Sequence, residues 1–225
     1  AYSVNSDYTT PSALGTLQGS GRTFTIYENN TSSLLGNSKD GITVQNGQTL
    51  NIIGANSNGF KNFTTAITNA GTTNINNISF SGNTLADIKN TGALNFTGGT
   101  VSLEKGITDA MTPTGTTTLS GAAVTLGDNA SLTQKNVIID ASSRLTSNAS
   151  KIISTSGITN NGILTYTGGT NSNVITGNGT INISDALALD ADVSAFAGNV
   201  LVADGKTVTI GSGGTFFTGA SNFTA

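Results

Sequence analysis

One fifteen-residue sequence occurs twice in the chain. Residues 88–102 read IKNTGALNFTGGTVS and residues 158–172 read ITNNGILTYTGGTNS, with nine identical positions. Both copies follow the pattern apolar-x-Asn-x-Gly-x-apolar-x-apolar. Internal repeats with a period of some tens of residues are typical of solenoids. The chain is therefore expected to consist of stacked coils, where a coil is one circuit of the chain around a common axis.

Looser or shortened copies of the pattern set the expected length of a coil. Steps between neighbouring copies run from 17 to 27 residues, and the 70 residues between the two full copies correspond to three coils of about 23 residues. The apolar residues that begin the copies are Val44, Ile67, Ile88, Ile158, Ile175 and Val202. At about 22 residues for each coil, the 225 residues of the chain make roughly ten coils.

Apolar and polar residues alternate within each copy, as in Leu50-Asn-Ile52 and Val208-Thr-Ile210. This alternation predicts strands with one buried face. Gly, Asn or Asp follows the strands, and these types favour tight turns. Leucine-rich repeats have a similar period, but their L-x-x-L-x-L-x-x-N pattern is absent. The sequence therefore predicts an all-β parallel β-helix with apolar residues inside, Thr, Ser and Asn outside, and Asn amides bonded along the axis at corners.

The composition favours strands and turns over helices. Charged residues make up 9% of the chain, and only two of them are Glu. Thr and Ile favour strands, whereas Asn and Gly favour turns. Strong helix formers are scarce, which agrees with the all-β prediction.

A single β-solenoid domain is expected over residues 23–225. Residues 1–22 have no clear repeat and contain Pro11, so they are expected to form an N-terminal cap or lead-in. Residues 105–117 contain Pro113 and predict a loop or an irregular coil.

Residues 184–200 fit two patterns. Leu189, Val193, Phe196 and Val200 have helical spacing, whereas Leu187 and Leu189 also suit a strand. A strand through Leu187 and Leu189, followed by a turn and a second strand from Val200, is the favoured prediction.

The residue types exclude several kinds of chemistry. The chain has no Cys and no His, which excludes disulfides, thiolate zinc sites and Ser-His-Asp or Cys-His catalysis. Nine Lys and Arg residues are scattered singly, so no nucleic-acid partner is expected. No apolar run approaches the roughly 18 residues of a membrane span, so no membrane-spanning segment is expected.

Asp185, Asp190 and Asp192 form the closest set of carboxylates in the sequence. Asp clusters bind calcium, and pairs of carboxylates carry out acid–base chemistry on polysaccharides. The arginines that would neutralise an acidic sugar, Arg22 and Arg144, are not near this set in the sequence. We therefore expect turn-forming aspartates, no catalytic residue and no cofactor, with calcium at these three residues as the metal alternative.

Residues 196–210 contain, in order, an aromatic residue, a Gly, an alternating strand, a second Gly and another strand. This order resembles the passenger-associated repeats of bacterial autotransporters, and YTGGT at residues 166–170 looks like the start of another unit. FSGN at 80–83 and FAGN at 196–199 are similar to the Phe-x-x-Asn element of polymorphic-type autotransporters, whose companion Gly-Gly-Ala-Ile element is absent. The resemblance implies a right-handed β-helix, export through the outer membrane, and either display on the bacterial surface or secretion.

Three classes of function are consistent with these features. The first is a non-enzymatic surface adhesin or passenger, a rigid stalk that binds a host or neighbouring-cell surface ligand or associates with itself. The second is a subunit of a self-assembling extracellular fibre or surface layer. Its candidate self-association residues are Phe216, Phe217 and Phe223, because solenoid ends expose unpaired edge groups. The third is a β-helix polysaccharide lyase or hydrolase.

Overall fold

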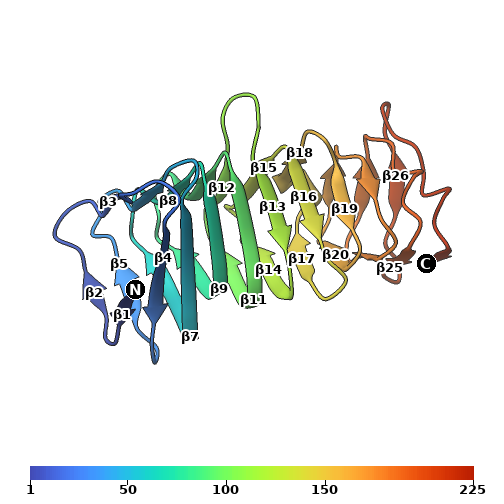
Figure 1. Ribbon diagram of the computed structural model, residues 1–225. Coiled ribbons are helices and arrows are strands. Elements are labelled where there is room, and N and C mark those ends of the chain that lie inside the picture. The colour runs from blue at the N-terminus through green and yellow to red at the C-terminus, as the bar shows by residue number, and fades with distance from the viewer.

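The chain forms a rod of stacked parallel coils in a computed structural model (Figure 1). The structure describes residues 1–225, except for the side chain of Ser57. About eleven coils follow one another along the axis, and the two termini lie at opposite ends of the rod (Figure 1). Neighbouring strands in successive coils pair in parallel. The prediction of an all-β parallel β-helix is confirmed.

Each coil runs along three faces of the rod. The first face contains β1 (Tyr2–Val4), β4 (Thr23–Glu28), the first parts of β7 (Thr49–Lys61), β9 (Thr72–Ser81) and β11 (Ala93–Leu103), then β13 (Thr116–Leu119), β16 (Asn136–Ile139), β19 (Ile158–Asn160) and β22 (Ile175–Thr176). The second face contains β2 (Tyr8–Thr9), β5 (Ser33–Leu35), the last parts of β7, β9 and β11, then β14 (Ala122–Leu126), β17 (Arg144–Ser147), β20 (Ile163–Tyr166), β23 (Thr180–Ile183), β25 (Asn199–Val202) and β27 (Asn222–Thr224).

The third face consists of two sheets. The longer sheet contains β3 (Gly15–Thr16), β6 (Ile42–Val44), β8 (Thr65–Asn69), β10 (Ala86–Asn90), β12 (Gly106–Thr108), β15 (Ser131–Gln134) and β18 (Ile152–Ser154). A shorter sheet of β21 (Gly169–Asn171), β24 (Leu187–Leu189) and β26 (Val208–Ile210) follows it. The 3-10 turn η1 (Ala149–Lys151) precedes β18. No helix in the described part of the chain is long and apolar enough to span a membrane.

The register between strands gives the length of each coil, as the difference between the numbers of two paired residues. The pair of Ile158 and Ile175 marks a short coil, whereas the pair of Ile26 and Ile52 marks a long one. Both differences lie within the range of coil lengths predicted from the repeats. A stack of about eleven coils at roughly 4.8 Å per coil is a rod about 50 Å long.

Residues 1–22 already belong to the stack. Their strands β1, β2 and β3 pair with β4, β5 and β6 of the next coil. The ring of Tyr2 also lies 5.5 Å from that of Phe24. The expected lead-in segment therefore supplies the first coil of the solenoid.

Both irregular stretches have the predicted form. Residues 109–115 leave the third face as a loop that projects from the rod (Figure 1), and Met111 in this loop is fully exposed. In the second stretch, β24 covers Leu187–Leu189 and β25 begins at Asn199. The strand alternative for residues 184–200 is confirmed.

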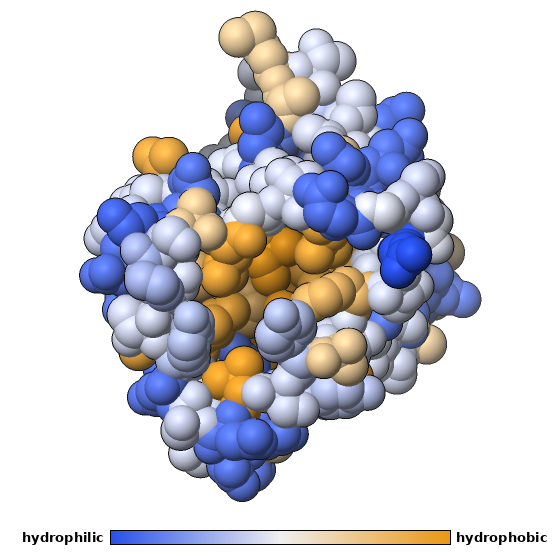
Figure 2. All heavy atoms as spheres, turned by 60° about the vertical axis from the view of Figure 1, so that its left-hand side comes forward, coloured by the Kyte–Doolittle hydropathy of each residue, from blue (hydrophilic) through white to orange (hydrophobic). Residues whose placement is uncertain are grey.

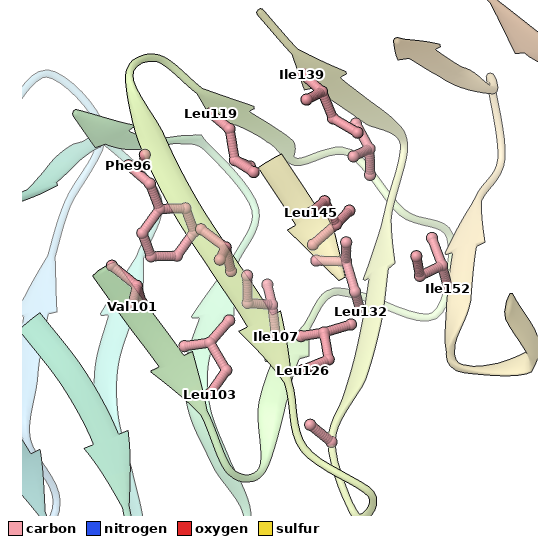
Figure 3. Packing of buried hydrophobic residues seen from close by; sticks show 14 of the residues in the cluster. Phe96, Val101, Leu103, Ile107, Leu119, Leu126, Leu132, Ile139, Leu145 and Ile152 are labelled. Carbon is pink, nitrogen blue, oxygen red and sulfur yellow. The ribbon is translucent and has the colours of Figure 1, made fainter. Parts of the chain in front are cut away.

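A continuous column of apolar side chains fills the rod. Figure 3 shows its middle part, where side chains from all three faces meet; the labelled residues are Phe96, Val101, Leu103, Ile107, Leu119, Leu126, Leu132, Ile139, Leu145 and Ile152. Phe96, Leu119 and Ile139 occupy the same position in three successive coils. Each apolar layer therefore covers the next, and the alternating strands place their polar residues on the outside.

The register shows that the predicted spacing of the two full copies was wrong. Ile88 lies on the third face, opposite Ile67 and Ile107, whereas Ile158 lies on the first face, opposite Val137 and Ile175. The segment between the copies is therefore not a whole number of coils. The copies are equivalent as corners of a coil, because each joins a strand on one face to a strand on the next.

Candidate functional site

Buried asparagines join successive coils at the corners. The side-chain Nδ2 of Asn90 donates to the carbonyl oxygen of Thr116 at 3.2 Å, and that of Asn160 donates to Thr180 at 2.9 Å. Both acceptors lie in the next coil, opposite the residue three positions after the Asn. Asn90 and Asn160 are fully buried. The repeated Asn is therefore a structural bond between coils rather than a group free to bind a ligand.

The glycine two positions after each Asn allows the coils to approach closely. A Cβ atom at Gly92 would overlap the carbonyl oxygen of Gly71 in the preceding coil. At Gly162 it would overlap the carbonyl oxygens of Asp140 and Ser143. The Asn-x-Gly element of both copies thus follows from contact between backbones.

A buried polar network surrounds Asn90. Its Nδ2 donates to Gln134 Oε1 at 2.6 Å and its Oδ1 accepts from Asn69 Nδ2 at 2.8 Å. Gln134 Nε2 donates to Asp109 Oδ2 at 3.0 Å, and the same oxygen accepts the backbone N–H of Gly115 at 2.8 Å. Asp109 therefore fixes both ends of the projecting loop. The Asn69–Asn90 bond confirms the predicted amide contact along the axis.

The Phe-x-x-Asn segments have different surroundings. Asn83 is buried, accepts the backbone N–H of Phe63 at 2.8 Å and donates to Asp87 at 2.8 Å. Burial raises the pKa of Asp87, although hydrogen bonds from Asn83 and from the next coil oppose that rise. Asn199 instead lies on the second face and accepts from Asn222 Nδ2 at 2.8 Å. Only the first segment therefore joins coils through a buried carboxylate.

Glu28 is the second buried carboxylate. Its Oε1 accepts the backbone N–H of Leu34 at 3.1 Å, while its buried Oε2 has no partner among the described groups. Burial raises the pKa of Glu28 to about 8, and the hydrogen bond from Leu34 lowers it only in part. A neutral carboxyl group at physiological pH accounts for this placement. Nothing in the sequence pattern distinguished Glu28 from a surface Glu.

The three aspartates proposed for calcium do not converge. Asp185 precedes β24 and lies 3.1 Å from Lys206 Nζ, whereas Asp190 follows β24. Asp192 accepts from the Ser194 hydroxyl at 2.6 Å, from the Thr215 hydroxyl and from the backbone N–H of Ser194 at 2.9 Å, and these bonds lower its pKa to about 2. Across the described side chains, no group of three or more acidic residues is placed to hold a metal ion. Asp185 and Asp192 instead bond to the neighbouring coil.

The C-terminal phenylalanines form a path from the interior to the surface. Phe217 is 3% exposed, and its ring lies 6.3 Å from that of Phe196 in the preceding coil. Phe216 lies between the rings of Phe217 at 5.9 Å and Phe223 at 4.9 Å. Phe223 is 40% exposed. Of the three residues, Phe217 belongs to the core and Phe223 offers the largest surface.

The first face carries an outward row of amides. Asn74 Nδ2 donates to Asn51 Oδ1 at 2.8 Å, and Asn95 Nδ2 donates to Asn74 Oδ1 at 2.8 Å. The row continues to the hydroxyl of Thr25, which accepts from Asn51 at 3.4 Å. We call Asn51, Asn74 and Asn95 the amide row. The sequence predicted Asn on the outside and bonded amides at corners, but the corner motif did not locate this row, which lies in mid-strand.

A shallow groove lies over Asn51 and Asn74 of the amide row. Its volume is about 330 Å³, and its lining residues are Asn51, Ile52, Ile53, Asn74, Asn76 and Thr97. Tyr27 lies beside Ile53 in the register of β4 and β7, and these two side chains are 40% and 37% exposed. Oriented amides and the aliphatic Ile53 therefore line the groove, and its lining has no ionisable side chain. The exposed Tyr27 lies beside this lining as the neighbour of Ile53.

Comparisons with protein-family models, with curated proteins and with solved structures found no match to this chain.

Proposed function

We propose that the chain is a rigid stalk of an exported bacterial surface protein, with a non-enzymatic role in adhesion or association between cells. The support is the stack of coils, in which strands such as β16 and β20 pair with the coils on both sides. Buried polar residues such as Asn90, Asn160 and Asp87 are engaged in bonds between coils. The autotransporter resemblance supplies the expectation of surface display.

Limited proteolysis tests the stalk. The fully exposed Met111 lies in the projecting loop, so the first cleavage is expected between residues 109 and 115. The two fragments should remain associated, because strands on each side of the cut pair with neighbouring coils. Replacement of residues 110–114 by a short Gly-Ser linker is the matched control for loop cleavage. Early cuts at many corners would contradict a rigid stalk.

A self-assembling fibre subunit is the second candidate. Figure 2 shows apolar side chains gathered in the middle of the N-terminal end, with polar residues around them. Partly buried Val4, Leu14, Leu17 and Phe24 pack there against the core. Sedimentation velocity over a range of protein concentrations tests end-to-end assembly. Association that persists in Leu14→Lys and Leu17→Lys would contradict assembly through this end.

A polysaccharide lyase or hydrolase is the third candidate. It would need a pair of neighbouring carboxylates, whereas Asp185 and Asp190 lie at opposite ends of β24. Release of oligosaccharides from acidic polysaccharides in the presence of calcium would favour this candidate over the stalk.

A further inference from the structure

We infer that the groove over the amide row binds a neutral polysaccharide chain. This inference names a ligand class for the adhesive role proposed above and rests on that proposal for its biological meaning. All the residues that would contact the polysaccharide lie on the first face. Three features of the groove carry it: the fixed orientation of its amides, its apolar edge and its lack of charge.

The amides are oriented before any ligand arrives. Each side-chain amide has two N–H donors and an oxygen with two acceptor positions. In Asn74, one N–H bonds to Asn51 and the oxygen accepts from Asn95. One donor and one acceptor position are thus left for a ligand at each step, repeated at about 4.8 Å along the axis. Neighbouring hydroxyl groups of a sugar ring match such donor–acceptor pairs.

The apolar edge suits the C–H face of a sugar ring. Tyr27 and Ile53 are neighbours on adjacent strands, with 40% and 37% of their side chains exposed. Asn76 lies opposite Ile53 in the following coil and lines the same groove. A sugar ring has a C–H face and a hydroxyl edge, so it can pack on Tyr27 while bonding to the amide row. A few polar groups beside an apolar surface are typical of ligand sites.

Charge favours a neutral polysaccharide over an acidic one. The groove lining contains only Asn, Ile and Thr. The chain as a whole has a net charge of −3. An acidic polysaccharide would therefore find no cation in the groove and would meet a weakly repulsive protein.

Titration of the complete, isotopically labelled chain with hexasaccharides tests the inference by NMR. The probes are the hexasaccharides of β-1,4-linked glucose, α-1,4-linked glucose and β-1,4-linked mannose, with an α-1,4-linked hexagalacturonate as the acidic counterpart. We expect millimolar binding of at least one neutral probe, with shifts confined to β4 and the first parts of β7, β9 and β11. Hexagalacturonate should bind at least tenfold more weakly.

Variants locate the site. Asn74→Ala and Tyr27→Ala should each weaken binding about tenfold, the loss expected when one good contact is removed. Asn222→Ala is the matched control, because Asn222 donates to Asn199 at 2.8 Å in the same kind of outer pair on the second face. It should bind like the unchanged chain. Circular dichroism verifies folding, and Asn51→Ala replaces Asn74→Ala if the latter unfolds.

Four results would overturn the inference. The first is the absence of shifts with every neutral probe at millimolar concentration. The second is equal binding of hexagalacturonate, and the third is an equal loss of binding in Asn222→Ala. The fourth is occupation of the groove by a second copy, seen as a dimer in sedimentation that Asn74→Ala abolishes. The stalk is tested separately by proteolysis, so a rigid rod without sugar binding would reject this inference alone.

Discussion

The corners at Asn90 and Asn160 have nearly the same sequence but different hydrogen bonding. Asn90 bonds to Asn69 in the preceding coil and to Gln134 in a later strand. Asn160 lies opposite Ile139, which has no polar side chain, and its buried Oδ1 has no partner among the described groups. Asn-x-Gly therefore sets the path of the backbone, while neighbouring coils decide how far each amide is satisfied.

The largest expected effect of a single substitution is at the glycine that both corners contain. Gly92→Ala and Gly162→Ala should each lower the free energy of unfolding by more than about 3 kcal/mol, because the added methyl group overlaps backbone carbonyls held in the stack. Urea unfolding followed by circular dichroism measures the loss. Gly127→Ala is the control, because a Cβ there meets only ordinary contacts. Tolerance at either corner would show that close backbone approach does not explain the repeated glycine.

Glu28, like Asn160, has a buried side-chain oxygen without a partner among the described groups. Unlike the amide of Asn160, the carboxyl group of Glu28 titrates. Its pKa is about 8 in the folded chain against 4.5 for an ordinary Glu, so its contribution to stability is full below pH 4.5 and is lost as pH rises to 8. At about 1.36 kcal/mol for each pKa unit, the loss should be on the order of 5 kcal/mol. Glu28→Gln should flatten the profile of unfolding midpoint against pH. Asp185→Asn, on an exposed residue, is the control, and an unchanged slope in Glu28→Gln would contradict this account.

Asn90→Ala and Asn160→Ala test the difference between the corners. We expect a loss of about 2–3 kcal/mol for Asn90→Ala, since Asn69 and Gln134 lose partners in the interior. Asn160→Ala should cost about 1 kcal/mol, because it removes one bond together with an unsatisfied oxygen. Chemical denaturation compares them. Equal losses would mean that the surrounding network adds nothing to the corner.

The smallest expected effect is at the amide row. Asn74→Ala removes two bonds between half-buried outward side chains, where water can replace them, so the unfolding free energy should fall by about 0.5 kcal/mol or less. Urea unfolding, run beside Asn90→Ala, measures the difference. A loss comparable to that of Asn90→Ala would show that the row is a structural element rather than a surface available to ligands.

Period-two alternation was sufficient to predict the strands and the interior, and the steps between repeat copies were sufficient to predict the range of coil lengths. It was not sufficient to assign faces, because the same corner sequence serves between the third and first faces at Asn90 and between the first and second at Asn160. The local sequence determines that the chain bends at a corner. The summed lengths of all coils determine which two faces that corner joins.

Side-chain roles were predictable only where the residue type dictates them. The outward position of Asn follows from alternation, and the repeated glycine was predicted at the corners as a turn former. Its close contacts with backbone carbonyls of the preceding coil were not predicted. The burial of Glu28 and Asp87 depends on neighbouring coils, so no local pattern marks it. The aspartates proposed for calcium were close in sequence, yet a strand separates Asp185 from Asp190.

The placement of the two termini at opposite ends of the rod has a mechanical consequence. Tension between the ends acts along the hydrogen bonds that join neighbouring coils. The coils therefore detach one after another, beginning at one end of the rod. A single coil that detaches, at about 17–26 residues, releases about 60–90 Å of extended chain. A tether built in this way absorbs a pull by lengthening in steps while the remaining coils stay folded.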